Sequence, residues 1–312
     1  MSAVSELASL RRGGKRPTPS PAQRGDGRAA ALFLAPWFAG LALVTVGPMV
    51  ASLYLSFTDY DLLRPPTWVG VENYLAMLDD PRLRTSLRVT FTYVVVGVPA
   101  QLLVALGLAL LLDRGMRGLA LYRSVFYLPS LLGGSVAIAI LWRQIFGTAG
   151  LVNQVLGFFG IAGEGWISHP DHALNTLIIL HVWTFGAPMI IFLAGLRQIP
   201  EMYYEAAAID GASTWRRFRS ITIPLLTPII FFNLVLQVIG AMQSFTQAFV
   251  VSGGTGGPID STLFYTLYLY QRGFTALDMG YASAMAWFLV VLIAALTALN
   301  FALSRYWVFY DD

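Results

Sequence analysis

Six long apolar runs are the feature of this sequence that most constrains its fold. Each run is close to the ~20 residues that cross the hydrocarbon core of a bilayer as a helix. Lipid offers the backbone no hydrogen-bond partner, so such runs are expected to be helical. The sequence therefore predicts an all-α membrane protein with six transmembrane helices. The runs cover residues 29–57, 89–112, 124–142, 174–196, 225–252 and 280–304, and none contains Asp, Glu, Lys or Arg.

Composition excludes several other classes of protein. Of the 312 residues, 56% are hydrophobic and only 12% are charged, which argues against a soluble enzyme or a disordered chain. The chain has no cysteine, so it has no disulfide framework and no thiolate metal site. Its arginines are spread between the apolar runs rather than gathered in one patch, so we expect no nucleic-acid partner.

The placement of positive charge predicts the orientation. Arg and Lys concentrate in the first 28 residues, in the loop between the second and third runs, and in the loop between the fourth and fifth. The positive-inside rule then puts both termini in the cytoplasm. Residues 1–28 are expected to be a mobile basic tail and residues 305–312 a short cytoplasmic end. The first run is too long for the 7–15-residue core of a signal peptide, so we interpret it as a retained span.

The sequence contains few residues that could carry proton coupling, bind ATP or bind a metal. His181 is the one ionisable side chain other than tyrosine within the runs, which disfavours proton coupling; an interior hydrogen-bonded histidine is the simpler interpretation. Lys15 is followed by Arg16, not by the Ser or Thr of a phosphate-binding loop, so ATP and magnesium would be bound by a partner chain. His169 and His172 lack an evident third ligand, and no metal site is predicted.

The loop at residues 198–224 carries a helix–turn–helix pattern. Pro200 suits a first helical position, Gly211 can adopt the left-handed conformation that ends a helix, and Ser213 or Thr214 can cap a second short helix. Pro224 is expected to open the fifth span. The centre of the first helix is small and smooth around a single carboxylate, Glu205. It could insert into a groove on another protein, or rest on lipid as an amphipathic surface helix.

This loop resembles the EAA motif of the membrane subunits of bacterial ABC importers. Glu205-Ala206-Ala207 is followed by Gly211 and then by Ile221-x-Ile223-Pro224, with the spacing of the family pattern and isoleucine for its leucine. The resemblance extends over roughly residues 32–304. It also includes Tyr-Arg-Ser-x-Phe-Tyr-Leu-Pro at residues 122–129, the Trp-Val-Gly-x-x-Asn-Tyr segment at 68–74 and the glycine-rich turn at 252–258. These segments look like the carbohydrate-uptake branch, specifically the maltose-type or glycerol-phosphate-type first permease subunit.

The resemblance implies a type I ABC importer permease fold and a set of partners. Glu205, Ala206, Ala207 and Gly211 would form the coupling helix that docks on an ATP-binding subunit dimer. A second homologous permease subunit would complete the pathway, and an extracytoplasmic solute-binding lipoprotein would deliver a polar solute, expected to be a carbohydrate. The chain would be a multi-pass protein of the bacterial cell membrane and no enzyme itself.

The fifth run offers a candidate pathway for that solute. Asn233, Gln237, Ser244 and Gln247 recur with Gly240 at helical spacing, so a continuous helix would present them on one face. Amides and hydroxyls can hydrogen-bond sugar hydroxyls, but they also hold membrane helices together. His181 and Thr184 on the fourth run are weaker candidates. The alternative function is an ATP-independent carrier or channel for small polar solutes.

Overall fold

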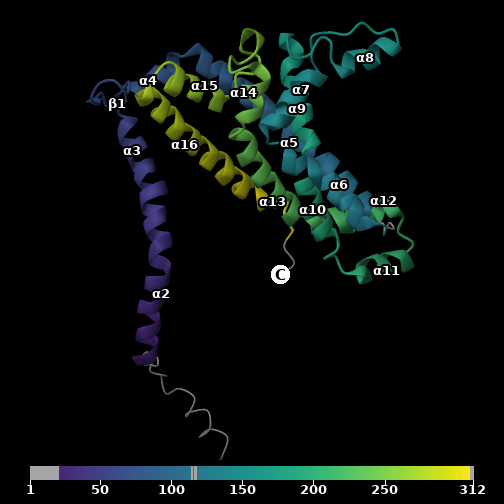
Figure 1. Cartoon of the computed structure of the whole chain (residues 1–312). Helices are drawn as coiled ribbons and strands as arrows, with labels where there is room; N and C mark the ends of the chain where they lie inside the picture. Colours follow the sequence, from purple (N-terminus) through teal and green to yellow (C-terminus); the bar gives the residue numbers. More distant parts are fainter. Residues whose placement is uncertain (1–20, 114, 116–117, 310–312) are drawn as a thin grey trace, which may run out of the picture. The chain divides into compact units, whose positions relative to one another are not determined.

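The computed structural model describes the backbone of residues 21–113, 115 and 118–309, and side chains from residue 30 onward. The chain divides into two compact units, Met1–Tyr54 and Leu55–Asp312. The secondary structure within both units is almost entirely helical (Figure 1).

The first unit is built on one helical rod. It consists of α2 (Pro21–Gly40), the π-helix η2 (Leu41–Val46) and α3 (Gly47–Leu55), which continues into the second unit by one residue. Residues 30–55 of this rod are long and apolar enough to span a membrane. Of the tail predicted to be mobile, residues 1–20 lie outside the described residues. Residues 21–28 belong to α2, which begins at a proline, a residue well suited to a first helical position.

The second unit contains a short hairpin and the remaining helices. In the hairpin, β1 (Thr58–Asp59) pairs antiparallel with β2 (Thr67–Trp68), with Thr58 opposite Trp68. The helices of the second unit that follow are α4 (Glu72–Asp79), α5 (Pro81–Asp113), α6 (Leu119–Leu132), α7 (Val136–Ile145), α8 (Leu151–Phe158), α9 (Pro170–Trp183), α10 (Gly186–Leu196), α11 (Glu201–Ile209), α12 (Thr214–Arg217), η3 (Phe218–Thr222), α13 (Ile223–Met242), α14 (Thr246–Ser252), η4 (Pro258–Asp260), α15 (Tyr265–Tyr270), η5 (Gln271–Thr275) and α16 (Met279–Ser304).

Helix α5 is the centre of this unit. It packs against α9, α10, α13 and α15, and it carries more buried residues than any other described helix. Small residues such as Ala105 and Ala109 are fully buried, which lets neighbouring helices approach closely. Pro99 lies within α5 without ending it.

Two of the predicted spans are bent rather than continuous. Helices α6 and α7 meet at 94°, and α9 and α10 meet at 41°. The first bend follows from Gly133-Gly134 and from Ser135, whose Oγ accepts the Ile138 N–H and so restarts the helix. The described residues therefore contain four long apolar helices, or six spans when each bent pair counts as one.

The fifth span differs from the prediction at both ends. Its helix runs without interruption from Thr214 through α12, η3 and α13, so it does not start at Pro224. The π-helical turn accommodates this proline, because Ile223 donates its N–H to Phe218, five residues back. At the other end the helix stops at Met242, and α14 begins after a break at residues 243–245. A continuous helix to residue 252 was therefore a wrong prediction.

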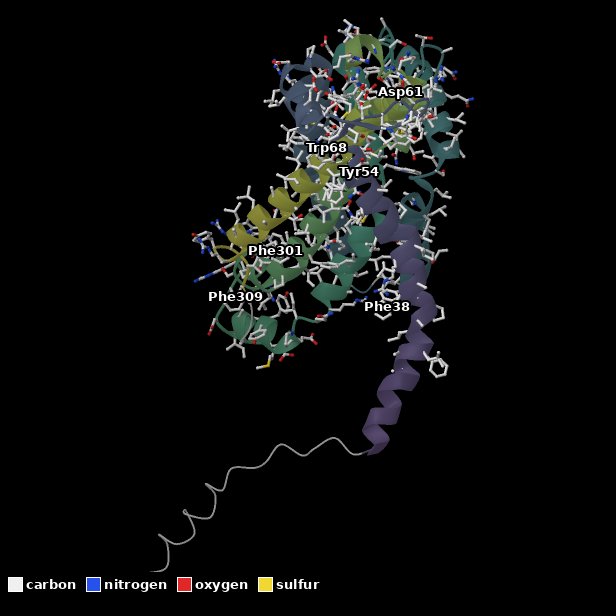
Figure 2. All side chains as sticks on the ribbon, turned by 90° about the vertical axis from the view of Figure 1, so that its left-hand side faces the viewer. Phe38, Tyr54, Asp61, Trp68, Phe301 and Phe309 are labelled. Atoms are coloured by element: carbon white, nitrogen blue, oxygen red, sulfur yellow. The ribbon has the colours of Figure 1, made fainter. Side chains whose placement is uncertain are left out.

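The second unit has two distinct ends (Figures 1 and 2). Helices α4, α15 and α8 lie at one end and α11 and α12 at the other. Asp61 and Trp68 of the hairpin region lie toward the first end, while Phe301 and Phe309 lie toward the second. The C-terminal segment folds back onto the fifth span, since the Phe309 N–H donates to Thr227 Oγ1 at 2.9 Å.

At the first end, the Asp80 carboxylate joins three helices. Its Oδ2 accepts hydrogen bonds from Tyr268 on α15 at 2.6 Å and from Tyr281 on α16 at 2.8 Å. Its Oδ1 accepts the N–H groups of Arg82 and Leu83 at the start of α5. Burial raises the pKa of Asp80, but the donated hydrogen bonds outweigh it and hold that pKa below its usual range. Burial and the neighbouring carboxylate raise the pKa of Tyr268 to about 12.

Candidate coupling surface and translocation cavity

Helix α11 and the turn after it form the predicted helix–turn–helix. Pro200 is the N-cap of α11 rather than its first residue. After the helix ends, Gly211 adopts φ +73°, and the Ala212 N–H donates to Ala207 O at 2.9 Å. Ser213 then caps α12 by accepting the Arg216 N–H. The roles predicted from the sequence for Gly211, as the left-handed residue, and for Ser213, as the cap of the second helix, are thus the roles that these residues have in the turn.

One face of α11 is open and smooth. Glu205, Ala206 and Gly211 are exposed and Ala207 is half-buried. Among the described residues, no hydrogen bond or ion pair involves the Glu205 carboxylate. The half-buried Tyr204 holds the other face, since its OH lies 2.9 Å from Thr222 Oγ1 on η3. We call the surface formed by Glu205, Ala206, Ala207 and Gly211 the coupling surface.

A cavity of about 280 Å³ lies where the fifth span breaks. It brings together side chains from α5, α9, the 243–245 break and α14. Its wall contains three of the predicted pathway residues, His181, Ser244 and Gln247. It also contains residues that were not singled out as candidates. The full lining is Tyr93, Gly134, His181, Gly240, Ala241, Gln243, Ser244, Phe245, Thr246 and Gln247. We call this space the translocation cavity.

His181 is a buried polar group in the wall of this cavity with spare hydrogen-bonding capacity. Its Nε2 is buried and has no hydrogen-bond partner among the described residues, unlike the satisfied interior histidine that the sequence favoured. The ring lies 5.1 Å from the Tyr93 ring. It fits beside α5 because Gly97 has no side chain there; a Cβ would lie 3.2 Å from His181 Cδ2. A solute hydroxyl could supply the missing partner.

The break at residues 243–245 turns the polar groups of the fifth span toward other elements. Gln247 donates from Nε2 to Gly133 O at 3.1 Å, and Ser244 Oγ lies 3.4 Å from Gln247 Oε1. Thr266 donates to the Ser244 carbonyl at 2.5 Å. The single helical face expected for these residues does not exist, because Ser244 lies in the break and Gln247 follows it.

The other predicted pathway residues do not line this cavity. Asn233 is fully buried and donates to Ile229 O at 3.2 Å within its own helix, and Gln237 is half-buried. Thr184 sits at the bend between α9 and α10, where its oxygens accept hydrogen bonds from Gln101 and Ser130. A sequence signal for the missed residues was the polar cluster itself: Gln243, Ser244, Thr246 and Gln247 are too closely spaced for one helical face.

The described residues contain no group of three or more His, Cys, Asp and Glu that could hold a metal ion. His172 Nε2 lies 3.1 Å from Glu164 Oε2, in an exposed pair outside the cavity.

Comparison with known proteins identifies the family. Residues 74–307 match the family described as "Binding-protein-dependent transport system inner membrane component". The chain belongs to this family. It is 52% identical over 291 residues to the "Probable ABC transporter permease protein YesP" of Bacillus subtilis (strain 168), covering 93% of this chain and 94% of that protein. It is 35% identical over 280 residues to the lactose transport system permease protein LacF of Rhizobium radiobacter, covering 88% and 93%.

A solved structure shows the same fold. The crystal structure of a bacterial alginate ABC transporter in complex with an alginate pentasaccharide-bound periplasmic protein contains a chain that superimposes with a TM-score of 0.78, at 20% identity over 90% of this chain and 95% of that one. The chain is thus a permease subunit of an ABC transporter, a multi-pass membrane component rather than an enzyme. Its resemblance to ABC importer permeases, expected from the EAA motif, is confirmed.

Proposed function

We propose that this permease forms half of the translocation pathway of an ATP-driven importer for a sugar or a related polar solute. Relatives that support a carbohydrate include the permeases named for lactose and, in Bacillus subtilis, for arabinooligosaccharides; the latter is 30% identical over 311 residues. The chemistry of the translocation cavity fits such a solute: its side-chain wall is made of amides, hydroxyls, an imidazole and aromatic rings, without Asp, Glu, Lys or Arg.

The coupling surface would transmit the energy of ATP. An ATP-binding subunit dimer would bind ATP and magnesium and would close around the exposed face of α11. Small residues allow the close approach of a partner, and a carboxylate in an otherwise uncharged patch fixes the register of docking by pairing with one basic residue. Movement of α11 would be carried directly to the fifth span, because the Tyr204–Thr222 contact and the continuous helix from Thr214 connect them.

The remaining parts of the assembly follow from the same proposal. A second related permease would complete the pathway, and an extracytoplasmic solute-binding lipoprotein would deliver the solute at the end that carries α4, α15 and α8. Both termini and the coupling surface would lie on the cytoplasmic side of the bacterial cell membrane. Within the cavity, His181, Ser244 and Gln247 are the favoured solute contacts, while Gln237, Asn233 and Thr184 would support the helices around it.

The observation that carries this proposal is the exposed Glu205 beside the small residues of α11, in the spacing of the EAA motif. The test is to measure solute uptake and solute-stimulated ATPase activity of the complete transporter in proteoliposomes. Glu205→Lys and Gly211→Asp should abolish both activities while the subunit still inserts. Glu72→Lys on α4 controls for the charge reversal as such: it makes the same change at an exposed position at the other end of the unit, and should leave assembly with the ATP-binding subunits and their solute-independent ATPase activity unchanged.

A carrier or channel that works without ATP is the competing function. It predicts uptake by this chain alone in liposomes, and normal uptake by both coupling-surface variants. Either result would contradict the ABC importer mechanism proposed for this chain.

A further inference from the structure

A second and larger cavity lies between α11 and the ends of three spans. Its volume is about 660 Å³. Tyr204 contributes to its wall from the half-buried face of α11, whereas Glu205, Ala206 and Gly211 do not line it. This cavity is therefore separate from the coupling surface and from the translocation cavity, although Tyr204 and Thr222, which connect α11 to the fifth span, both contribute to its wall.

The position of this cavity corresponds to the headgroup region of a bilayer. Asp113, the last residue of α5, and Leu196, the last residue of α10, both line it. Thr214, the first residue of the fifth spanning helix, lines it too. Because α5, the bent pair α9–α10 and the helix from Thr214 are each long enough to cross the hydrocarbon core, their ends reach the level where acyl chains give way to phosphate groups.

The walls of the cavity are apolar on the side of the spans. Leu110, Leu196 and Phe218 supply that surface. Trp215 completes the rim: its ring lies 5.5 Å from the Phe218 ring, and the residue is 68% exposed. An exposed tryptophan beside an apolar wall is typical of residues at the membrane–water interface.

An arginine lies in the wall of the same cavity. Arg217 is half-buried, and its Nε is fully buried with no hydrogen-bond partner among the described residues. Asp113 does not neutralise it, since that carboxylate pairs with Arg197 at 3.6 Å. Asp210 borders a smaller neighbouring cavity together with Arg217, but no ion pair joins the two. No ion pair to the Arg217 guanidinium is found among the described residues, and a half-buried cation is costly to leave unpaired, which points to an anionic ligand in this space.

We infer that this cavity binds the headgroup of an anionic phospholipid. The phosphate accepts hydrogen bonds from the Arg217 guanidinium, whose planar array of donors suits phosphate oxygens. The parts of the acyl chains next to the headgroup lie along Leu110, Leu196 and Phe218. A free phosphate ion would gain nothing from those apolar walls, whereas a lipid satisfies the charge and the walls together. The bound lipid then stabilises the packing of α11 against the ends of α5 and α10.

The test is lipid retention by the complete transporter. The wild type and variants are purified, depleted of lipid and titrated with phosphatidylglycerol or phosphatidylcholine, and bound lipids are counted by native mass spectrometry. We expect the wild type to retain phosphatidylglycerol in preference to phosphatidylcholine, and Arg217→Gln to bind phosphatidylglycerol about tenfold more weakly or worse. Arg216→Gln removes an adjacent, exposed arginine and should bind as the wild type does.

Three results would overturn the inference. They are equal phosphatidylglycerol retention by the wild type and Arg217→Gln, no preference of the wild type for phosphatidylglycerol, and displacement of the lipid by millimolar inorganic phosphate. If Arg217→Gln does not assemble, the lipid preference and the phosphate competition of the wild type still decide the question. Lipid retention needs no ATP and no solute, so its failure would leave the coupling proposal intact, and failure of coupling would leave lipid retention intact.

Discussion

Gly133 packs against Thr184 with no room for a side chain, since a Cβ atom at residue 133 would overlap with Thr184 Cγ2. The contact joins the bend between α6 and α7 to the bend between α9 and α10. Gln247, just after the break in the fifth span, donates to the carbonyl of the same glycine. The interruptions of three predicted spans thus meet around one residue, beside the translocation cavity.

Replacing this glycine should be costly. Gly133→Ala must push Thr184 away and would also bring a methyl group to 2.9 Å from Pro129 O. We expect a loss of about 1–3 kcal/mol of stability, typical of overpacking in a dense interior. Thermal unfolding of the complete transporter in detergent measures it. Gly134→Ala is the matched control, because its Cβ would meet nothing within 4 Å.

A second substitution tests the cause of that loss. Thr184→Ser removes the overlapping methyl group and keeps the hydroxyl that accepts from Gln101. The double variant Gly133→Ala/Thr184→Ser should recover part of the stability lost by Gly133→Ala alone. A double variant no more stable than Gly133→Ala would place the strain elsewhere, at the Pro129 carbonyl.

The Asp80 carboxylate should be worth more than an ordinary surface charge. Asp80→Asn replaces an acceptor of four hydrogen bonds, two of them from Tyr268 and Tyr281, by a neutral amide. We expect a loss of about 1–2 kcal/mol, in the lower part of the range for hydrogen bonds to charged groups because the carboxylate is partly solvated. Chemical unfolding of the wild type and of Asp80→Asn measures the difference in the free energy of unfolding. Asp79→Asn, at the exposed neighbouring residue, should change stability by less than about 0.5 kcal/mol.

Acid should erase the advantage that Asp80 gives. The pKa of Asp80 is held below its usual value, so its contribution is fully present above the unfolded-state pKa of about 3.9 and is lost as the pH falls through the lower folded-state pKa. The stability gap between the wild type and Asp80→Asn should therefore be constant from about pH 5 to 8 and narrow below about pH 4. Thermal midpoints of both variants across this range provide the measurement. A gap that is unchanged in acid would contradict the assignment.

Features set by neighbouring residues could be predicted from the sequence. The end of α11 at Gly211 and the cap at Ser213 each depend on a few adjacent positions, and both were expected. The sixth span, residues 280–304, was also predictable from nearby residues, because Asp278 caps the helix that begins at Met279. Apolar runs of this length leave few alternatives to a helix in a membrane.

Features set by distant parts of the chain could not be read in this way. The partners of Asp80 lie 188 and 201 residues further along the sequence, so this residue was indistinguishable from an ordinary loop aspartate. Hydropathy also misses a bend inside an apolar run, and it gave residues 124–142 and 225–252 as continuous helices. The cavity at the second of these breaks depends on contacts with Tyr93 and His181 from other helices, which a single-helix pattern does not contain.

The conformation of Gly211 gives a sharp test of the turn after α11. Its φ of +73° favours glycine, tolerates asparagine and strains alanine by about 1 kcal/mol, while a Cβ there would meet nothing within 4 Å. The strain alone should therefore shift the turn about fivefold toward other conformations in Gly211→Ala, and less in Gly211→Asn. Solute transported per ATP hydrolysed should fall in that order, with membrane insertion unchanged. Gly107→Ala, which adds a methyl group in open space without a positive φ, should behave as the wild type does. Equal loss in the alanine and asparagine variants would mean that the coupling surface rejects any side chain at residue 211, and that the left-handed turn is not what limits coupling.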